Sequence, residues 1–452
     1  MKIQFLGATG TVTGSKYLLR QDGATLMIDC GLFQGYKQLR LRNWATLPVA
    51  ASEIGALILT HAHIDHTGYV PLLVKQGFRG KIYCTQATRE LCAIMLPDSG
   101  HLQEEEAAYA NRHGFSKHAP AQPLYTEDDA RKALLLFQPV EFGKAWQPAP
   151  GLSATLSPSG HMVGSAFVRV EGGGRSILFT GDLGRPNDPV LKPPQQMPGA
   201  DYLVTESTYG DRVHEPVDVL AQLAQVIKRT AARGGVLLIP AFAVGRAQTL
   251  MHCIAELKKS QAIPDLPVYL NSPMAADATE VYWRHRDEHR LSEADCAAMC
   301  HAAKIINTVE ESRELNTRYG PMIVIAASGM ATGGRVVHHL KAFAPDWRTT
   351  ILFTSFQAGG TRGAAMVGGA RTIRIHGEDV PVRAEVAVLG NLSGHADADE
   401  ILEWLRGFEQ APKLSFITHG EPAASDALRQ RMERELDWPC RVPEYLETVD
   451  LA

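Results

Sequence analysis

Metal-binding side chains are concentrated in the segment HAHIDH, residues 61–66, which follows the apolar run 56–59 and Thr60. Four of these six residues are candidate ligands: His61, His63, Asp65 and His66. Such a density exceeds what one tetrahedral zinc ion usually draws from a single loop, so we expect two metal ions to share it. A polar turn on the surface is the alternative, but the apolar strand that leads straight into the segment argues against it.

Three more candidate ligands stand elsewhere in the same local setting: His161 in SGHMVG, Asp182 in FTGDLG and His419 in SFITHGE. Each lies at or just past the end of a β-rich apolar run and next to a glycine. A single histidine in such a place is more often a hydrogen-bonded structural residue. The shared setting instead predicts that all seven side chains meet at one edge of a strand-rich core.

The order of expected elements changes along the chain. Residues 1–208 contain short strands and then strands, loops and helices, which is typical of a sheet-on-sheet core with outer helices. Residues 209–375 alternate apolar strands with helices, which predicts a parallel sheet covered on both faces. Residues 376–452 then supply further strands and His419. We therefore expect a first domain that is interrupted by an inserted α/β domain and completed by the last segment.

Composition restricts the function classes. The net charge of -4 lacks the overall basic character of a nonspecific nucleic-acid binder. No apolar run approaches the roughly 18 residues of a membrane span, so we expect no membrane association. The seven cysteines are scattered without a CxxC pair, and the first residues lack the apolar core of a signal peptide. These features predict reduced thiols and a cytoplasmic location.

The motifs HAHIDH, SGHMVGSA, FTGDLG and ITHGE together resemble the metallo-β-lactamase superfamily. VTESTYGDR with Glu206, LSGHAD with His395 and ITHGE with His419 are similar to the three extra motifs of its β-CASP branch. That branch includes the cleavage and polyadenylation endonuclease and ribonuclease J, and the resemblance spans nearly the whole chain. It implies an α/β fold: a metallo-β-lactamase αββα sandwich with an inserted β-CASP domain, a parallel sheet flanked by helices.

The resemblance also implies roles for the candidate residues. One zinc ion would be held by His61, His63 and His161, and the other by Asp65, His66 and His419, with Asp182 as the bridge. Two Zn²⁺ per chain are therefore expected, because five histidines favour zinc over other metals.

Asp65, His395 and Glu206 are the expected catalytic residues. His395 would protonate the leaving 3′-oxygen, since imidazole changes protonation state near neutral pH. Glu206 would orient and charge a histidine, as carboxylates often do around metals. The alternatives are a structural histidine that caps the following helix and a carboxylate that caps a helix or faces solvent.

Glycine-rich loops after strands are candidates for phosphate binding, because their backbone N–H groups can converge on an anion. The loops are SGMATGGR, SFQAGGTRG and LSGHA, and VGRAQ opens a helix with an arginine. Ordinary turns and a solvated basic face are the alternatives. The candidate phosphate contacts are Ser328, Gly329, Thr332, Gly333, Arg335, Gln357, Thr361, Ser393 and Arg246.

The function that fits these observations is a zinc-dependent ribonuclease that hydrolyses phosphodiester bonds of single-stranded RNA. The choice between endonucleolytic and additional 5′-exonucleolytic cleavage stays open. His419 at the last motif resembles the RNA-acting members, whereas DNA-repair members tend to have valine there. The alternatives are a small-molecule ester or thioester hydrolase and a noncatalytic scaffold in RNA processing. The oligomeric state stays open, with a homodimer as one option.

Overall fold

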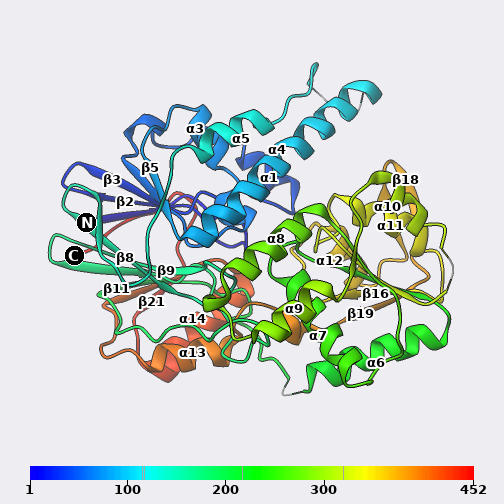
Figure 1. The fold of residues 1–452 in the computed structure, drawn as a ribbon. Coiled ribbons are helices and arrows are strands. Elements are labelled where there is room, and N and C mark those ends of the chain that lie inside the picture. The colour runs from blue at the N-terminus through cyan, green and yellow to red at the C-terminus, as the bar shows by residue number, and fades with distance from the viewer. Residues whose placement is uncertain (115, 117, 216, 319) are drawn as a thin grey trace. The chain divides into compact units, whose positions relative to one another are not determined.

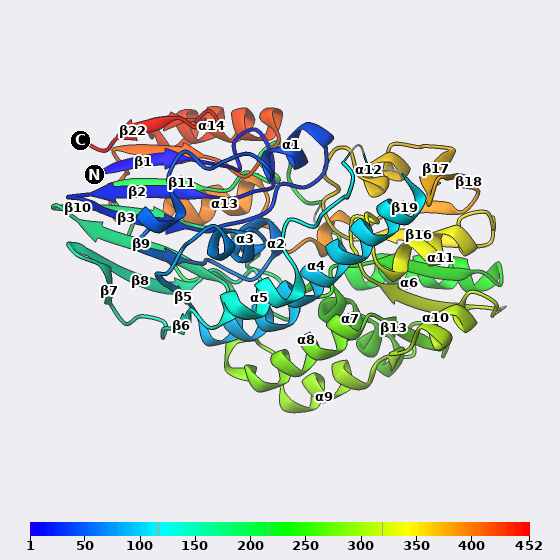
Figure 2. The same ribbon diagram turned by 90° about the horizontal axis from the view of Figure 1, so that it is seen from above.

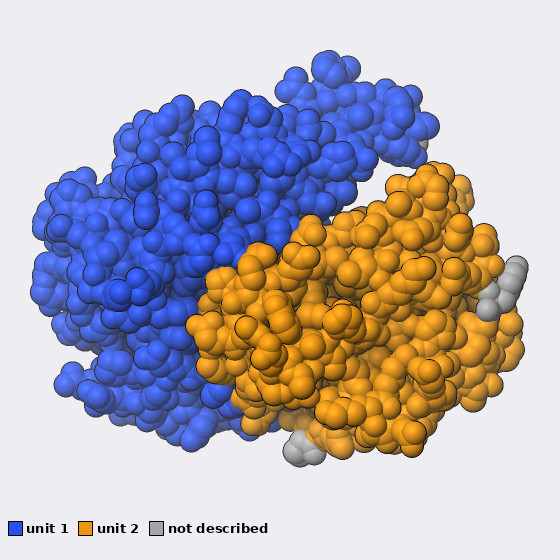
Figure 3. All heavy atoms as spheres, in the orientation of Figure 1, with its two compact units in different colours: residues 1–186, 193–213, 395–452 blue, residues 187–192, 214–394 orange. Residues whose placement is uncertain are grey.

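The computed structural model describes residues 1–114, 116, 118–215, 217–318 and 320–452. The chain forms two compact units, which Figure 3 shows in different colours. Unit 1 comprises residues 1–186, 193–213 and 395–452, and unit 2 comprises residues 187–192 and 214–394. Within the described ranges, no helix is both long and apolar enough to cross a membrane.

The first sheet of unit 1 has seven strands in the order β22-β1-β2-β3-β4-β5-β6. Strands β1 to β3 are antiparallel neighbours, whereas β3 to β6 pair in parallel. Their bounds are β1 Lys2–Phe5, β2 Tyr17–Gln21, β3 Ala24–Ile28, β4 Ala56–Ile58, β5 Lys81–Cys84, β6 Phe137–Pro139 and β22 Thr448–Asp450.

The second sheet of unit 1 also has seven strands, in the order β21-β20-β11-β10-β9-β8-β7. Strands β7 to β10 form an antiparallel meander, and β10, β11, β20 and β21 pair in parallel. Their bounds are β7 Trp146–Ala149, β8 Leu152–Pro158, β9 Ala166–Gly172, β10 Arg175–Phe179, β11 Tyr202–Thr205, β20 Leu414–Ile417 and β21 Cys440–Arg441.

Aromatic side chains join the two sheets face to face. The ring of Phe5 lies 6.0 Å from that of Tyr17 and 5.0 Å from that of Phe416, and Tyr17 lies 5.6 Å from Phe179. All four rings are buried within one apolar cluster that draws residues from both sheets. Burial of side chains from the inner faces of both sheets in one core is what holds a sandwich together.

Helices cover the outer faces of the sandwich (Figures 1 and 2). On the second sheet, Phe167, Leu178 and Leu203 pack with Leu405 of α13 and Leu428 of α14. The other helices of unit 1 follow strands of the first sheet. The expected αββα sandwich is confirmed. The helix bounds are α1 Lys37–Arg42, α2 Ile64–Thr67, α3 Val70–Lys75, α4 Gln86–His113, α5 Glu127–Leu134, α13 Ala398–Arg406 and α14 Pro422–Leu436.

Unit 2 is built on a six-stranded parallel sheet in the order β14-β13-β15-β12-β16-β19. Its strands β12, β15 and β16 are almost continuously apolar and buried, as expected for strands covered on both faces. The strand bounds are β12 Val236–Pro240, β13 Val268–Asn271, β14 Lys304–Ile305, β15 Met322–Ala326, β16 Thr350–Phe353 and β19 Glu385–Val388, with the hairpin β17 Thr372–Ile375 and β18 Glu378–Pro381.

The helices of unit 2 alternate with these strands, which confirms the expected α/β pattern. They are α6 Val219–Ala232, α7 Arg246–Lys259, α8 Pro273–Arg284, α9 Glu293–His301, α10 Val309–Leu315, α11 Arg335–Phe343 and α12 Arg362–Val367. The domain boundaries at residues 208 and 375 stay a prediction. The compact unit 2 begins and ends at other residues.

A candidate dinuclear metal centre

All seven candidate ligands lie in unit 1 shortly after the ends of strands, either in loops or on the short helix α2. His61 comes after β4, and His161, Asp182 and His419 come after β8, β10 and β20. Strands β8 to β11 and β20 are consecutive in one sheet, and β4 belongs to the facing sheet. The two edges therefore bring loops that are distant in sequence to one place, as the shared local setting predicts.

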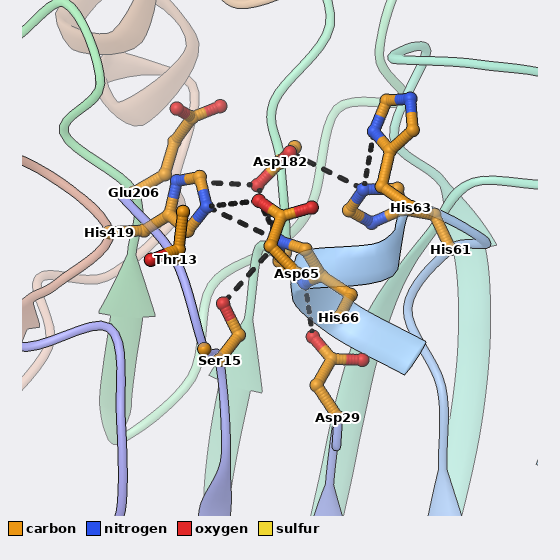
Figure 4. A network of polar contacts seen from close by, with 12 residues as sticks. Thr13, Ser15, Asp29, His61, His63, Asp65, His66, Asp182, Glu206 and His419 are labelled. Carbon is orange, nitrogen blue, oxygen red and sulfur yellow. Dashed lines mark hydrogen bonds and ion pairs between the residues drawn. The ribbon is translucent and has the colours of Figure 1, made fainter. Parts of the chain in front are cut away.

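The helix after the first motif begins earlier than its sequence suggests. TGYVPLLVKQG predicts one helix beyond the motif, whereas α2 starts at Ile64 inside it and α3 follows from Val70. His63 is the residue before the first turn, and Asp65 and His66 are on α2. Both residues place a ligand atom beside Nε2 of His419, as Figure 4 shows.

Three histidines and one carboxylate oxygen form the first ligand group. Nδ1 of His63 lies 3.1 Å from Nε2 of His61 and 3.2 Å from Nε2 of His161. Oδ2 of Asp182 lies 3.3 Å from Nε2 of His61 and 3.4 Å from Nε2 of His161. These are the residues that the family resemblance groups on one metal ion.

The second ligand group uses the other oxygen of the same carboxylate. Oδ1 of Asp182 lies 3.2 Å from Nε2 of His66. That nitrogen lies 3.3 Å from Nε2 of His419, which in turn lies 3.4 Å from Oδ2 of Asp65. Figure 4 shows Asp182 between the two groups. One carboxylate thus presents one oxygen to each group, which is the arrangement of a bridging ligand.

The spacing of these atoms fits metal ligation. With metal–nitrogen bonds of 2.0–2.1 Å, the edge of a tetrahedral zinc site is about 3.3 Å. The ligand atoms of both groups lie at close to this separation. Imidazole nitrogens that face one another also repel unless a proton or a cation lies between them. The donor set, mainly imidazole with carboxylate, suits zinc.

The protonation states of the first group suit a metal. Burial, and after it the charge of His66, lower the pKa of His61 to about 3. Burial likewise lowers the pKa of His63 and His161. Burial alone would raise the pKa of Asp182, but the surrounding histidines hold it well below its usual range. At neutral pH the group therefore presents neutral imidazoles and an ionised carboxylate, the forms that bind metal.

His66 is the exception, because it is the cation of the cluster in the absence of metal. Its burial would lower the pKa, but the carboxylates of Asp182 and Asp29 raise it well above the usual value. Nδ1 of His66 donates to Oδ2 of Asp29 at 2.7 Å, and the hydroxyl of Thr60 donates to the same oxygen at 2.8 Å. A bound metal would take the place of the proton on Nε2 while Asp29 fixes the ring through Nδ1.

The partners behind the ligands are residues for which the sequence analysis assigned no role. Besides Asp29 and Thr60, the hydroxyl of Thr208 lies 3.1 Å from Nδ1 of His419. Asp29 directly follows β3, the strand next to β4, inside the motif MIDCG, so its place at a sheet edge was a usable signal. Thr208 follows β11 inside the motif VTESTYGDR, so its place was a usable signal as well.

Backbone geometry at the centre needs two unusual positions. His419 has a φ of 48°, which is rare for a residue other than glycine. A Cβ added to Gly31 would meet the carbonyl oxygen of Asp65 at 1.5 Å. The backbone N–H of Cys30 donates to the carbonyl of His66 at 2.7 Å. The chain around Gly31 therefore packs directly against the ligand loop, and only glycine leaves it room.

His395 and Glu206 form a pair beside the ligands. Nδ1 of His395 donates to Oε2 of Glu206 at 3.0 Å and lies 3.9 Å from Oδ2 of Asp182. Burial would lower the pKa of His395, but Glu206 and then Asp182 raise it to about 9. Oε1 of Glu206 accepts from the backbone N–H of Leu183 at 2.6 Å. The carboxylate thus links the histidine to the loop of Asp182.

The candidate phosphate contacts all lie in unit 2, in loops at the carboxyl ends of parallel strands. Those loops follow β12, β15, β16 and β19, so they share one edge of the sheet. The amide of Gln357 donates to the carbonyl of Gly329 at 3.2 Å, and the hydroxyls of Ser328 and Thr332 lie 3.1 Å apart. The hydroxyl of Thr361 caps α12 through the N–H of Ala364.

Two of the candidate arginines are already engaged by protein acceptors. Arg246 is buried, and its guanidinium binds the carbonyl of Leu392 and, at 3.3 Å, the carboxylate of Asp188. The guanidinium of Arg335 donates to Oδ1 of Asn271 at 2.8 Å and to the carbonyls of Ile306 and Asn307 at 2.9 and 2.6 Å. Both arginines therefore tie elements of unit 2 together.

Three family models match the chain. The model of the metallo-beta-lactamase superfamily matches residues 9–225, the Beta-Casp domain matches residues 247–366, and the Zn-dependent metallo-hydrolase RNA specificity domain matches residues 379–443.

Similar proteins cover most of the chain. Ribonuclease TTHA0252 of Thermus thermophilus is 36% identical over 93% of this chain and 93% of its own length. Transcription termination factor FttA of Methanosarcina mazei is 30% identical over 100% of this chain and 72% of its own length. A solved structure of a protein of unknown function from Enterococcus faecalis covers 99% of both chains with a TM-score of 0.53 and 12% identity, which shows likeness of fold alone.

Proposed function

The chain belongs to the metallo-β-lactamase superfamily, within it to the members with a Beta-Casp domain, and on this premise we propose that it is a zinc-dependent ribonuclease acting on single-stranded RNA. The match to a Zn-dependent RNA specificity domain supports both the metal and the substrate class. The name of the relative from Thermus thermophilus supports the reaction.

The observation that carries this proposal is the bridged pair of ligand groups around Asp182. We propose two zinc ions, one with His61, His63 and His161 and one with Asp65, His66 and His419. Zinc would supply Lewis-acid chemistry, since it brings the pKa of a water molecule to about 7 and stabilises negative charge developing at phosphorus.

The protein's own residues account for the proton on the leaving group. In the proposed reaction, Nδ1–H of His395 stays bonded to Glu206, so Nε2 is the atom that delivers a proton to the leaving 3′-oxygen. The raised pKa of His395 keeps that proton in place at neutral pH. Glu206 orients the ring and supports its charge. Asp65 has a double role, as ligand and as the partly exposed carboxylate that faces incoming substrate.

Unit 2 would bind the substrate's backbone. We propose that Ser328, Gly329, Thr332, Gly333, Gln357, Thr361 and Ser393 contact phosphates through loop N–H and hydroxyl groups. Arg246 and Arg335 hold those loops in place, because their guanidinium groups are already bonded to carbonyl and carboxylate oxygens. A cytoplasmic location belongs to the same proposal.

The test is incubation of the purified chain with end-labelled single-stranded RNA, with and without a chelator. We expect cleavage that the chelator abolishes and that added zinc restores. His63→Ala should lose both cleavage and bound zinc, whereas His101→Ala, which removes an exposed histidine on α4, should keep both. Product lengths separate endonucleolytic from 5′-exonucleolytic cleavage. Cleavage that survives both the chelator and His63→Ala contradicts the proposal.

A further inference from the structure

An exposed segment of unit 1, residues 36–44, combines aromatic and basic side chains. Tyr36 is 48% exposed, Leu41 57% and Trp44 59%. Large apolar side chains are more often buried, so a group of exposed ones marks a binding surface. The segment includes α1 and the two residues that follow it, and neither the ligand groups nor the phosphate candidates use any of its residues. We call it the aromatic–basic segment.

The charge of the segment has one sign. Its charged residues are Lys37, Arg40 and Arg42, and residues 30–52 contain no aspartate or glutamate. Lys37 and Arg40 are exposed, and no ion pair joins them to a carboxylate within the part of the chain that the structure describes. In contrast, the exposed Lys132 and Lys144 in the same unit are paired with Asp128 and Glu141. The segment therefore offers cationic groups to a partner from outside.

The backbone that carries these side chains is fixed. Asn43 is buried, accepts the N–H of Phe33 at 2.9 Å and donates to its carbonyl at 2.8 Å. The guanidinium of Arg42 lies 4.1 Å from the ring of Tyr445 and 5.5 Å from that of Phe33. Trp44 thus follows an anchored residue, so its ring is presented from a rigid support and binding costs little ordering.

The backbone just before this segment is hydrogen-bonded directly to the ligand loop. The N–H of Leu32 donates to the carbonyl of Ile64 at 3.0 Å, and the N–H of Gln34 donates to the hydroxyl of Thr13 at 3.1 Å. Tyr36 lies four positions after Leu32 in the chain, a span of at most about 14 Å. The aromatic–basic segment therefore lies close to the ligand loop and belongs to the same rigid unit.

We propose that the aromatic–basic segment binds single-stranded RNA, with bases stacked on Trp44 and Tyr36 and phosphates held by Lys37 and Arg40. This inference rests on the proposed function for its substrate class. Exposed aromatic rings interleaved with unpaired cations are how proteins hold single strands without reading their sequence. The chain's net charge of -4 does not oppose this, because the cations are concentrated locally.

Binding of an intact strand tests the stacking. The assay is fluorescence anisotropy of labelled oligoadenylate with the zinc-loaded full chain, carrying His395→Ala throughout so that the strand is not consumed. Trp44→Ala and Tyr36→Ala should each weaken binding roughly 5- to 150-fold, the range for loss of one stacked base. The effect should be smaller on oligouridylate, whose bases stack less. In the cleaving chain, Trp44→Ala should raise KM and leave kcat unchanged.

Trp347→Ala is the matched control. Trp347 is 65% exposed. The neighbouring Arg348, however, forms an ion pair with Asp346, so its charge is already matched by a carboxylate. We expect unchanged binding. Equal binding by the Trp44→Ala and Trp347→Ala proteins overturns the inference.

Salt dependence tests the cations separately. Replacing Lys37 and Arg40 with alanine should lower the slope of log affinity against log salt by about 1.4, the value for two phosphate contacts on a single strand. Replacing the carboxylate-paired Lys132 and Lys144 should leave that slope unchanged. Equal slopes for the two double variants would overturn the phosphate contacts.

The outcomes separate this inference from the proposed function. Binding that depends on Trp44 in a chain that never cleaves RNA contradicts the proposed function and leaves the segment's role standing. Cleavage with binding indifferent to Trp44 contradicts the segment's role alone. Co-sedimentation with phosphatidylserine vesicles that Trp44→Ala abolishes, without any change in RNA binding, would assign the segment to a lipid surface instead.

Discussion

At the scale of single residues, local environment gives six buried or half-buried histidines of the site different chemical roles. Burial makes His61 neutral, as a ligand must be, while the carboxylates around His395 hold its proton. Asp182 lies beside both rings and raises the pKa of each, but at His61 the effect of burial outweighs it. The same few ångströms thus contain neutral ligands and a protonated acid, which is what a hydrolytic site requires.

Replacing the proposed acid should separate catalysis from metal binding. His395→Ala is expected to keep its bound zinc and to lose about 10²- to 10⁴-fold in turnover, the usual contribution of a general acid. Zinc content by mass spectrometry and single-turnover RNA cleavage measure the two effects. Unchanged turnover in the His395→Ala protein would remove this residue as the acid.

The Glu206→Gln variant should lose activity at a lower alkaline pH than the wild type, because the anion that raises the pKa of His395 is removed.

At the scale of elements, the centre depends on how closely the segment after β3 packs on α2. Gly31 lies against the carbonyl of Asp65, and the neighbouring N–H groups of Cys30 and Leu32 donate to the backbone of His66 and Ile64. Both strands that lead into this packing, β3 and β4, pair in parallel. The position of two ligands is therefore set by backbone contacts between adjacent loops.

A methyl group at Gly31 should disturb the ligand loop more than the fold. We expect Gly31→Ala to weaken zinc binding about 10- to 100-fold, as loss of support behind ligands does. It should lower the free energy of unfolding by about 1–3 kcal/mol through overpacking. Zinc titration with a competing chelator and urea unfolding give the two numbers. Gly390→Ala is the control, since that glycine has open space and no positive φ. Wild-type zinc affinity in the Gly31→Ala protein would show that the loop adapts.

The strands and helices could be predicted from the sequence because the patterns that specify them are local. An apolar run followed by HAHIDH specifies a strand end with ligands, and apolar strands alternating with helices specify the sheet of unit 2. Hydrogen-bond partners could not be predicted where they are brought together only by tertiary contacts. The acceptors of the Arg335 guanidinium come from β13 and from residues 306 and 307, and no local pattern announces them. The start of α2 inside the motif was missed because ligand density resembles a loop.

At the scale of the whole molecule, unit 1 and unit 2 each have an apolar core of their own. Unit 1 also contains a charged residue that opposes its stability. Lys16 is only 1% exposed, and its ammonium lies 4.6 Å from the ring of Phe33 and 4.8 Å from that of Tyr69. Burial lowers its pKa from 10.5 to about 8, against a small upward effect of Cys30. The two rings partly replace the water that the charge has lost.

The lowered pKa of Lys16 makes a signed prediction for stability against pH. Between pH 8 and 10.5 the unfolded chain keeps a proton that the folded chain releases, so this group's contribution to the free energy of unfolding rises with pH. The full change is about 3 kcal/mol. Cys30, whose pKa burial raises to about 12, acts in the opposite direction, so the wild-type profile alone does not isolate Lys16.

The difference between wild type and Lys16→Met isolates Lys16 up to pH 10, because the folded chain keeps the proton of Cys30, with its pKa of about 12, throughout that range. We expect the variant to be the more stable protein at pH 7, by up to about 3 kcal/mol less the contribution of the two cation–π contacts. That advantage should shrink as the pH rises from 8 to 10, because wild-type Lys16 then becomes neutral as well. Urea unfolding at pH 7, 8, 9 and 10 measures the gap, with Lys132→Met as an exposed control. A gap that stays constant over this range would mean that the buried ammonium keeps an ordinary pKa, because Phe33 and Tyr69 stabilise it as strongly as burial destabilises it.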